Sequence, residues 1–131
     1  MKILVTGGSG YFGCTLRRRL RERGAEVRNF DLAPCDDLAV GETYMRGDIR
    51  DAEAVRHACE GIQIVHHNVA QVPLAKNRHL FESVNVTGTE NLLAAARAAG
   101  VRKVVYTSSS AVFGVPGQNP VTEDMTPSSP I

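Results

Sequence analysis

The size and charge of the chain limit what kind of protein it can be. Its 131 residues suffice for one domain, and 43% apolar with 22% charged residues is an ordinary globular balance. The net charge of +1 provides no overall field that would attract nucleic acid or anionic lipid, and no apolar run is long enough to span a membrane. Cys14, Cys35 and Cys59 lack the paired spacing of metal or redox motifs. We therefore expect a cytoplasmic protein with reduced thiols, no metal, and no nucleic-acid or membrane partner.

Short β-branched runs alternate along the chain with segments of helical period. The expected strands are "KILVT" (2–6), "EVRNF" (26–30), "YMRG" (44–47), "IQIVHH" (62–67) and "KVVYTS" (103–108), and helices are expected over 11–23, 51–60 and 79–99. This alternation of strands and helices is typical of α/β proteins with a parallel sheet.

The first predicted helix is strongly basic. Phe12, Leu16 and Leu20 recur every four residues and form an apolar stripe, and Gly24 ends the helix. The arginines of "LRRRLRER" point away from that stripe, and Glu22 interrupts the run without interleaved aromatic residues. We interpret the basic run as a solvated helix face and not as a nucleic-acid patch.

Caps and glycines mark the ends of the later elements. Asp51 is a candidate N-cap for the middle helix, with Gly61 as its stop, and Gly100 closes the last helix. Gly88 costs that last helix about 1 kcal/mol relative to alanine, so we expect a close approach of helix to sheet there. From residue 114 to residue 131 the periodicity disappears and four of the six prolines occur, which predicts a surface loop or linker.

A glycine-rich turn follows the first strand. In "TGGSGYFG", Gly7, Gly10 and Gly13 would allow a tight turn and a close approach of backbone N–H groups to a pyrophosphate at the helix N-terminus. The spacing is G-x-x-G-x-x-G, one residue wider than the G-x-G-x-x-G fingerprint. Asp31 ends the second strand eighteen residues after Gly13, where an acid can accept both ribose hydroxyls and repel a 2′-phosphate. The glycine turn and Asp31 together favour NAD over NADP. Arg28, nearby in the sequence, leaves the choice open, because an arginine can accommodate a 2′-phosphate.

Two further strand ends carry polar side chains. Asp48, in "RGDIRD", follows the third strand and is either an acceptor for the adenine amino group or a turn aspartate before a helix. His66 and His67 are adjacent on a strand and so point to opposite faces, which disfavours a shared metal ion. We interpret at least one of them as a hydrogen-bonded core histidine.

The combined pattern resembles the extended short-chain dehydrogenase/reductase family, in particular its NAD-dependent epimerase/dehydratase group typified by UDP-glucose 4-epimerase. The resemblance covers essentially the whole chain. Its motifs in chain order are "ILVTGGSGYFG", Asp31, "GDIRD", "VHHNVAQV", "NVTGTENLL" and "VVYTSSSAVFG". It implies a Rossmann-type doubly wound parallel sheet in three αβα layers, with residues 1–131 as a single NAD-binding domain.

The resemblance also implies roles for individual residues. Backbone groups near Gly7, Gly10, Tyr11, Phe12 and Gly13 would hold the diphosphate, Asp31 and Leu32 the adenosine ribose, Asp48 and Ile49 the adenine, and Val69, Ala70 and Gln71 would line the cofactor path. "HNVA" departs here from the more usual His-x-Ala-Ala. Asn85 would lie near the catalytic centre, where the alternative is a polar residue on a helix surface. Ser109 would bind the reacting oxygen of the substrate, with Ser108 counted among the cofactor-binding residues and Ser110 as a structural neighbour.

The catalytic base of the family does not occur in this sequence. The family takes the substrate proton with the tyrosine of Tyr-x-x-x-Lys, whereas Tyr11, Tyr44 and Tyr106 have no lysine four residues later and Phe113 replaces a usual tyrosine. We therefore expect a chain truncated before the helix that carries Tyr-x-x-x-Lys. Alone it should bind NAD weakly and be inactive, and a homodimer is suggested only for the full-length protein.

Three functions stay open. The first is the NAD-binding portion of a sugar-nucleotide epimerase or dehydratase that oxidises a hydroxyl transiently by hydride transfer to NAD. The second is a hydroxysteroid-type dehydrogenase, and the third is a non-catalytic NAD-binding or redox-sensing module. The presence or absence of Tyr-x-x-x-Lys downstream of Ile131 would separate the enzymes from the sensor.

Overall fold

The computed structural model of the protein describes residues 1–71, 77–114, 117 and 120–127. Of the segment expected to be a terminal loop, residues 115–116, 118–119 and 128–131 lie outside the described residues. No helix within the described part of the chain is both long enough and apolar enough to cross a membrane.

Strands and helices alternate as the sequence predicts. The elements in chain order are β1 (Lys2–Thr6), α1 (Tyr11–Glu22), β2 (Glu26–Asp31), β3 (Glu42–Arg46), α2 (Ala52–Cys59), β4 (Ile64–His67), α3 (Arg78–Glu82), the π-helix η1 (Ser83–Thr87), α4 (Gly88–Ala98), β5 (Lys103–Tyr106) and the 3₁₀-helix η2 (Ser110–Phe113).

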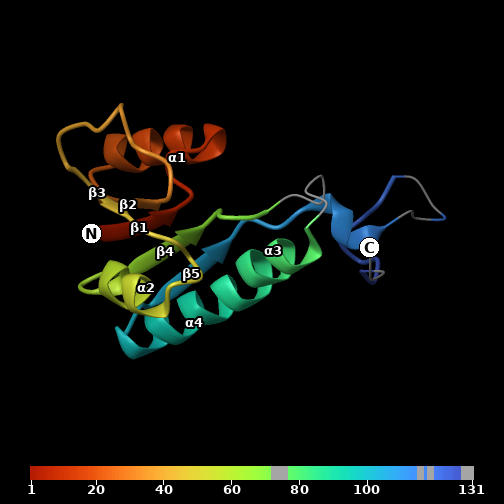
Figure 1. Ribbon diagram of the computed structural model, residues 1–131. Helices are drawn as coiled ribbons and strands as arrows, with labels where there is room; N and C mark the ends of the chain where they lie inside the picture. The colour runs from red at the N-terminus through yellow and green to blue at the C-terminus, as the bar shows by residue number, and fades with distance from the viewer. Residues whose placement is uncertain (72–76, 115–116, 118–119, 128–131) are drawn as a thin grey trace.

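The five strands form one parallel sheet in the order β3-β2-β1-β4-β5. Helix α1 covers one face, and α2 and α4 cover the other (Figure 1). The predicted Rossmann-type, three-layer αβα architecture is thus confirmed. The strand order reverses direction between β1 and β4, and a ligand of such a sheet binds outside the carboxyl ends of the strands at that point.

Each sheet face carries its own apolar core because successive side chains of a strand alternate between faces. Ile3 and Val5 point to the α1 side, where Leu16 and Leu20 pack against them. The opposite face holds the larger core, built from Leu4, Phe30, Ile49, Val55, Val65 and Leu92 among others. Phe12, predicted to extend the stripe of α1, is instead 54% exposed in its first turn.

The last long helix is interrupted, which the sequence did not predict. The expected helix over 79–99 consists of α3, the π-helix η1 and α4, and it ends at Ala98. A β-carbon on Gly88 would lie 2.7 Å from Cγ2 of Ile49. The close approach expected at Gly88 therefore exists, but to the segment after β3 and not to a strand.

Helix α2 is capped at both ends by side chains. Oδ1 of Asp51 accepts hydrogen bonds from the backbone N–H groups of Glu53 at 3.0 Å and Ala54 at 3.1 Å, which confirms the predicted N-cap. At the other end, Nη1 of Arg28 donates to the carbonyls of Ala58 at 2.7 Å and Glu60 at 3.0 Å. Arg28 is therefore engaged by a helix C-terminus, where a cation is favourable.

The prediction of a fully solvated basic face on α1 is wrong for two arginines. Arg17 is 1% exposed and donates from Nη1 to Oε2 of Glu42 at 2.7 Å, and Arg21 donates to the other oxygen of Glu42 at 3.0 Å. The side chain of Glu42, at the start of β3, is itself fully buried. A buried carboxylate requires a partner of opposite charge, which draws these two arginines inward.

Candidate functional site

The glycine turn between β1 and α1 is shaped for close approach. Gly7 has φ +69°, a conformation that favours glycine, and its carbonyl accepts from the N–H of Gly10 at 3.2 Å. A β-carbon on Gly13 would lie 2.2 Å from the carbonyl oxygen of Gly7, so only glycine lets α1 pack onto the turn. Gly10 is the N-cap and makes no side-chain cap bond, while Tyr11 beside it is 98% exposed. The turn thus presents the positive end of α1 to an anion.

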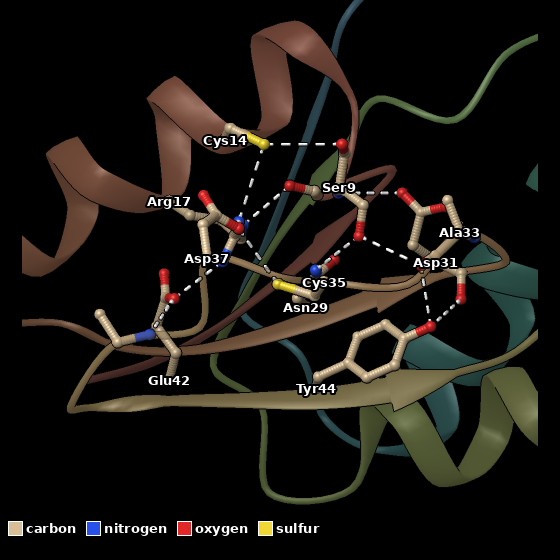
Figure 2. A network of polar contacts seen from close by, with 12 residues as sticks. Ser9, Cys14, Arg17, Asn29, Asp31, Ala33, Cys35, Asp37, Glu42 and Tyr44 are labelled. Atoms are coloured by element: carbon tan, nitrogen blue, oxygen red, sulfur yellow. Dashed lines mark hydrogen bonds and ion pairs between the residues drawn. The ribbon is translucent and has the colours of Figure 1, made fainter.

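Asp31 lies beside this turn at the end of β2, as expected. Its Oδ2 accepts from the backbone N–H of Ser9 at 2.9 Å, and its Oδ1 accepts from that of Ala33 at 2.9 Å (Figure 2). The bond to Ala33 is typical of an aspartate in a turn, and the bond to Ser9 joins the acid to the glycine turn. Each carboxylate oxygen has a further lone pair, so the carboxylate can still accept two hydroxyls.

Tyr44 on β3 supports this arrangement and was missed as a site residue in the sequence. Its hydroxyl donates toward the carbonyl of Ala33 at 2.8 Å, and the carbonyl oxygen of Asp31 lies 3.3 Å away. The tyrosine therefore holds the backbone that follows the acid.

A cavity of about 200 Å³ opens at the carboxyl ends of β2, β3 and β4. Its lining residues are Phe30, Asp31, Leu32, Gly47, Asp48, Ile49, Val69, Ala70, Gln71 and Val84. Every residue assigned to the ribose, the adenine or the cofactor path is among them. A small cavity with a mostly apolar lining that includes two carboxylates and one amide suits a planar base.

Three lining residues were not predicted from the sequence. A β-carbon on Gly47 would lie 2.3 Å from Cε2 of Phe30, so this glycine lets the segment after β3 close over the ring. The glycine in "RGD", directly after a strand, was an available signal for it. Phe30 and Val84 showed no pattern other than that of ordinary core residues.

Asp48 is a turn aspartate that also lines the cavity, and its role toward the adenine stays a prediction. Its Oδ1 accepts from the backbone N–H of Arg50 at 2.9 Å, as a turn aspartate does, and the side chain also lines the cavity. Hydrogen bonds from the Arg50 side chain hold the pKa of Asp48 below its ordinary value. The carboxylate therefore stays ionised and can only accept, which suits an amino group.

Asn85 reaches the cavity wall indirectly. It lies in η1, with Nδ2 donating to the carbonyl of Gln71 at 2.9 Å and Oδ1 accepting from the N–H of Gln71 at 2.8 Å. Both amide atoms thus fix the backbone of Gln71 at the cavity. Asn85 is half-buried and is not a solvated surface residue.

His67 is the hydrogen-bonded core histidine that the sequence predicts. Thr89 Oγ1 donates to the carbonyl of Asn85 at 2.7 Å, so it can only accept at His67 Nε2, 3.1 Å away. Nε2 of His67 therefore carries the proton, and Nδ1 accepts from the hydroxyl of Thr6 at 2.7 Å. Burial lowers the pKa of His67 to about 4. The ring is neutral and links β1 and β4 to α4.

The serine cluster lies apart from the cavity lining. Ser109 is exposed, and its Oγ accepts from the backbone N–H of Ala111 at 3.2 Å as the N-cap of η2. Ser108 is exposed beside it. Both follow β5 at the same sheet edge as the other candidate residues. The substrate role of Ser109 and the cofactor role of Ser108 stay predictions.

Comparison with known proteins gives this geometry a context. The model of the 3-beta hydroxysteroid dehydrogenase/isomerase family matches residues 4–128. A 3 beta-hydroxysteroid dehydrogenase/Delta 5-->4-isomerase of Mycobacterium tuberculosis is 40% identical over 126 residues, covering 90% of this chain and 34% of that protein.

Two solved structures have the same fold. A short-chain dehydrogenase/reductase superfamily protein of Agrobacterium tumefaciens with bound NAD is 38% identical at a TM-score of 0.91, over 100% of this chain and 40% of that chain. UDP-glucose 4-epimerase of Thermus thermophilus in complex with NAD is 35% identical at a TM-score of 0.87, over 98% and 44%. The chain thus spans less than half the length of these proteins. The family match from the first strand to residue 128 shows that the chain belongs to the 3-beta hydroxysteroid dehydrogenase/isomerase family.

Proposed function

We propose that this chain forms the adenosine- and diphosphate-binding part of an NAD-dependent dehydrogenase of the short-chain type. The observation that carries the proposal is the carboxylate of Asp31, held between the glycine turn and the mouth of the cavity by the N–H groups of Ser9 and Ala33. Two solved structures with the same fold contain NAD, which supports the choice of cofactor.

The geometry favours NAD over NADP. A 2′-phosphate on the adenosine ribose would meet the charge of Asp31, and NADP sites usually offset that phosphate with an arginine. Arg28, the arginine that left the choice open in the sequence, donates to the carbonyls at the end of α2 and so is not directed at a ribose. We therefore assign NAD.

The residues of this chain would bind and orient the cofactor. The turn at Gly7, Gly10 and Gly13 would hold the diphosphate, Asp31 the ribose hydroxyls, and Asp48 the adenine amino group. Bound NAD supplies the hydride acceptor for a substrate hydroxyl. Ser109 would bind the reacting oxygen, and the proton would go to a tyrosine of Tyr-x-x-x-Lys, a motif that these 131 residues do not contain.

A hydroxysteroid-type substrate is the first candidate because the family model and the Mycobacterium tuberculosis relative both belong to that class. A sugar nucleotide is the second, favoured by the likeness to UDP-glucose 4-epimerase. Oxidation of a 3β-hydroxysteroid by a protein that contains this chain and Tyr-x-x-x-Lys would support the first. Interconversion of UDP-sugars without net NADH would support the second, and neither activity would leave a non-catalytic NAD-binding module.

Calorimetric titration of the 131-residue chain with NAD and NADP tests the cofactor assignment. Asp31→Ala should weaken NAD binding by about tenfold or more, as expected for hydrogen bonds to a charged group worth about 1.5 to 3 kcal/mol. It should also narrow the difference between NAD and NADP. Asp36→Ala, which removes an exposed acid from the same loop, is the matched control. Equal NAD affinity in wild type and Asp31→Ala would remove the assignment.

A further inference from the structure

The buried guanidinium of Arg17 is the centre of a network between α1, the loop after β2 and the start of β3 (Figure 2). Nε of Arg17 donates to the carbonyl of Gly8 at 2.7 Å, and Nη1 donates to Oε2 of Glu42 at 2.7 Å. Nη2 pairs with Oδ1 of Asp37 and lies 3.7 Å from Sγ of Cys14. The donors of one side chain thus connect the glycine turn to the segment that follows the candidate ribose site.

The peptide group between Gly8 and Ser9 is held from both sides. Arg17 binds its carbonyl oxygen, and Oδ2 of Asp31 binds its N–H at 2.9 Å. Because a peptide group is planar, the direction of the carbonyl sets the direction of the N–H. The position of the Arg17 guanidinium therefore determines how the turn presents its N–H to the Asp31 carboxylate.

Asn29 shows how closely the turn is held. Its Nδ2 donates to Oγ of Ser9 at 3.0 Å, and a β-carbon on Gly8 would lie 2.3 Å from its Oδ1. That Oδ1 is buried and has no hydrogen-bond partner among the described residues. An unpaired buried acceptor costs free energy, so the close packing of the turn on β2 is maintained against that cost.

Stability alone does not account for a charged residue at this position. Glu42 compensates Arg17 with a fully buried carboxylate, and it also accepts from Arg21 and from the N–H of Ala39. A buried ion pair of this kind commonly adds no more stability than apolar side chains of the same volume. What an apolar side chain could not supply is a donor for the Gly8 carbonyl.

We propose that Arg17 is a positioning residue for cofactor binding. Through the Gly8–Ser9 peptide it orients the carboxylate of Asp31 toward the ribose hydroxyls, and so it contributes to NAD affinity without touching NAD. This inference rests on the proposed function, since it requires that Asp31 binds the ribose.

A double-mutant cycle on the 131-residue chain tests the proposal. NAD affinity is measured by calorimetry for wild type, Arg17→Met, Asp31→Ala and the double variant. Arg17→Met should weaken NAD binding by about tenfold, the order expected when a hydrogen bond to a charged group is misplaced. In the Asp31→Ala background the same change should have less than about twofold effect, because residues that act through one another are not additive.

Two further variants distinguish positioning from folding. Arg17→Lys keeps the charge but cannot reach Gly8 and Glu42 with separate donors, so its affinity should lie between those of wild type and Arg17→Met. Arg18→Met, at the exposed neighbouring position, should bind NAD like wild type. Circular dichroism and the unfolding midpoint of each variant report the fold.

Each result decides a separate question. No NAD binding by the folded wild-type chain would remove the proposed function itself. If Arg17→Met weakens NAD binding equally in the wild-type and the Asp31→Ala backgrounds, the positioning role is overturned. Wild-type NAD affinity in Arg17→Met would overturn it as well. If Arg17→Met does not fold, the cycle is measured with Arg17→Lys under the same criterion.

Discussion

His67 makes the stability of this protein sensitive to acid. Its ring is buried and neutral, with the proton on Nε2 toward Thr89 and with Nδ1 accepting from Thr6. Burial holds the pKa of the folded-state ring at about 4, below the 6.5 of an unfolded chain. Below pH 6.5 the imidazole of His67 binds a proton in the unfolded chain, whereas in the folded protein it stays neutral down to about pH 4. The contribution of the neutral ring to the unfolding free energy is therefore fully present above pH 6.5 and is lost as the pH falls toward about 4.

The size of this effect follows from the two pKa values. One pKa unit corresponds to about 1.4 kcal/mol, so His67 alone should remove about 3 kcal/mol of unfolding free energy by pH 4. A loss of this size is a large part of the total stability of a small domain. Urea unfolding of wild type and His67→Gln at a series of values between about pH 7.5 and pH 4 measures it.

The comparison of the two pH profiles decides the question. Glutamine has a donor and an acceptor but does not titrate, so His67→Gln should lose less stability on acidification than wild type. Near pH 7 the variant should be less stable than wild type. Burial lowers the pKa of His66 as well. Because wild type and His67→Gln both contain His66, its titration affects the two pH profiles alike. His79→Gln, at an exposed position on α3, is the matched control. Parallel profiles for wild type and His67→Gln would refute the reasoning.

Three other substitutions test single contacts. Gly13→Ala places a β-carbon 2.2 Å from the carbonyl oxygen of Gly7, so the turn must shift and NAD binding measured by calorimetry should be lost; retained affinity would contradict the role of the turn. Asp51→Ala removes the N-cap of α2 and should lower the unfolding free energy by about 1 kcal/mol in urea titration, with Asp51→Asn close to wild type. Gly88→Ala places a β-carbon against Ile49 and should lower the unfolding free energy by about 1 to 3 kcal/mol. If Gly88→Ala lowers it by the same amount in an Ile49→Ala background, this contact is not the cause.

The sequence was sufficient for the elements and for much of the candidate site. Strand ends, the glycine turn and the Asp51 cap depend on contacts within a few residues, and such contacts leave patterns in the chain. Most of the cavity residues at the ends of β2, β3 and β4 were expected from the family resemblance, and their positions agree with parallel strands that bring their carboxyl ends to one edge. Resemblance to a family then gave those positions their expected roles.

The sequence could not predict how the helix over 79–99 is divided. A π-turn adds one residue to the helical repeat, and the apolar spacing of three and four is compatible with an uninterrupted helix. Asn85, whose side chain makes two hydrogen bonds with the backbone of Gln71, lies in this π-helix.

This sequence by itself determined the alternation of strands and helices, the glycine turn and the acid that ends β2. Only the tertiary structure decided which arginines of α1 are buried, that Arg28 caps α2, and in which direction the hydrogen bonds of His67 run. The physical reason is distance along the chain. Glu42 is 25 residues from Arg17, and Thr6 is 61 residues from His67. The partner of each side chain therefore cannot be recognised from the residues that neighbour it in the sequence.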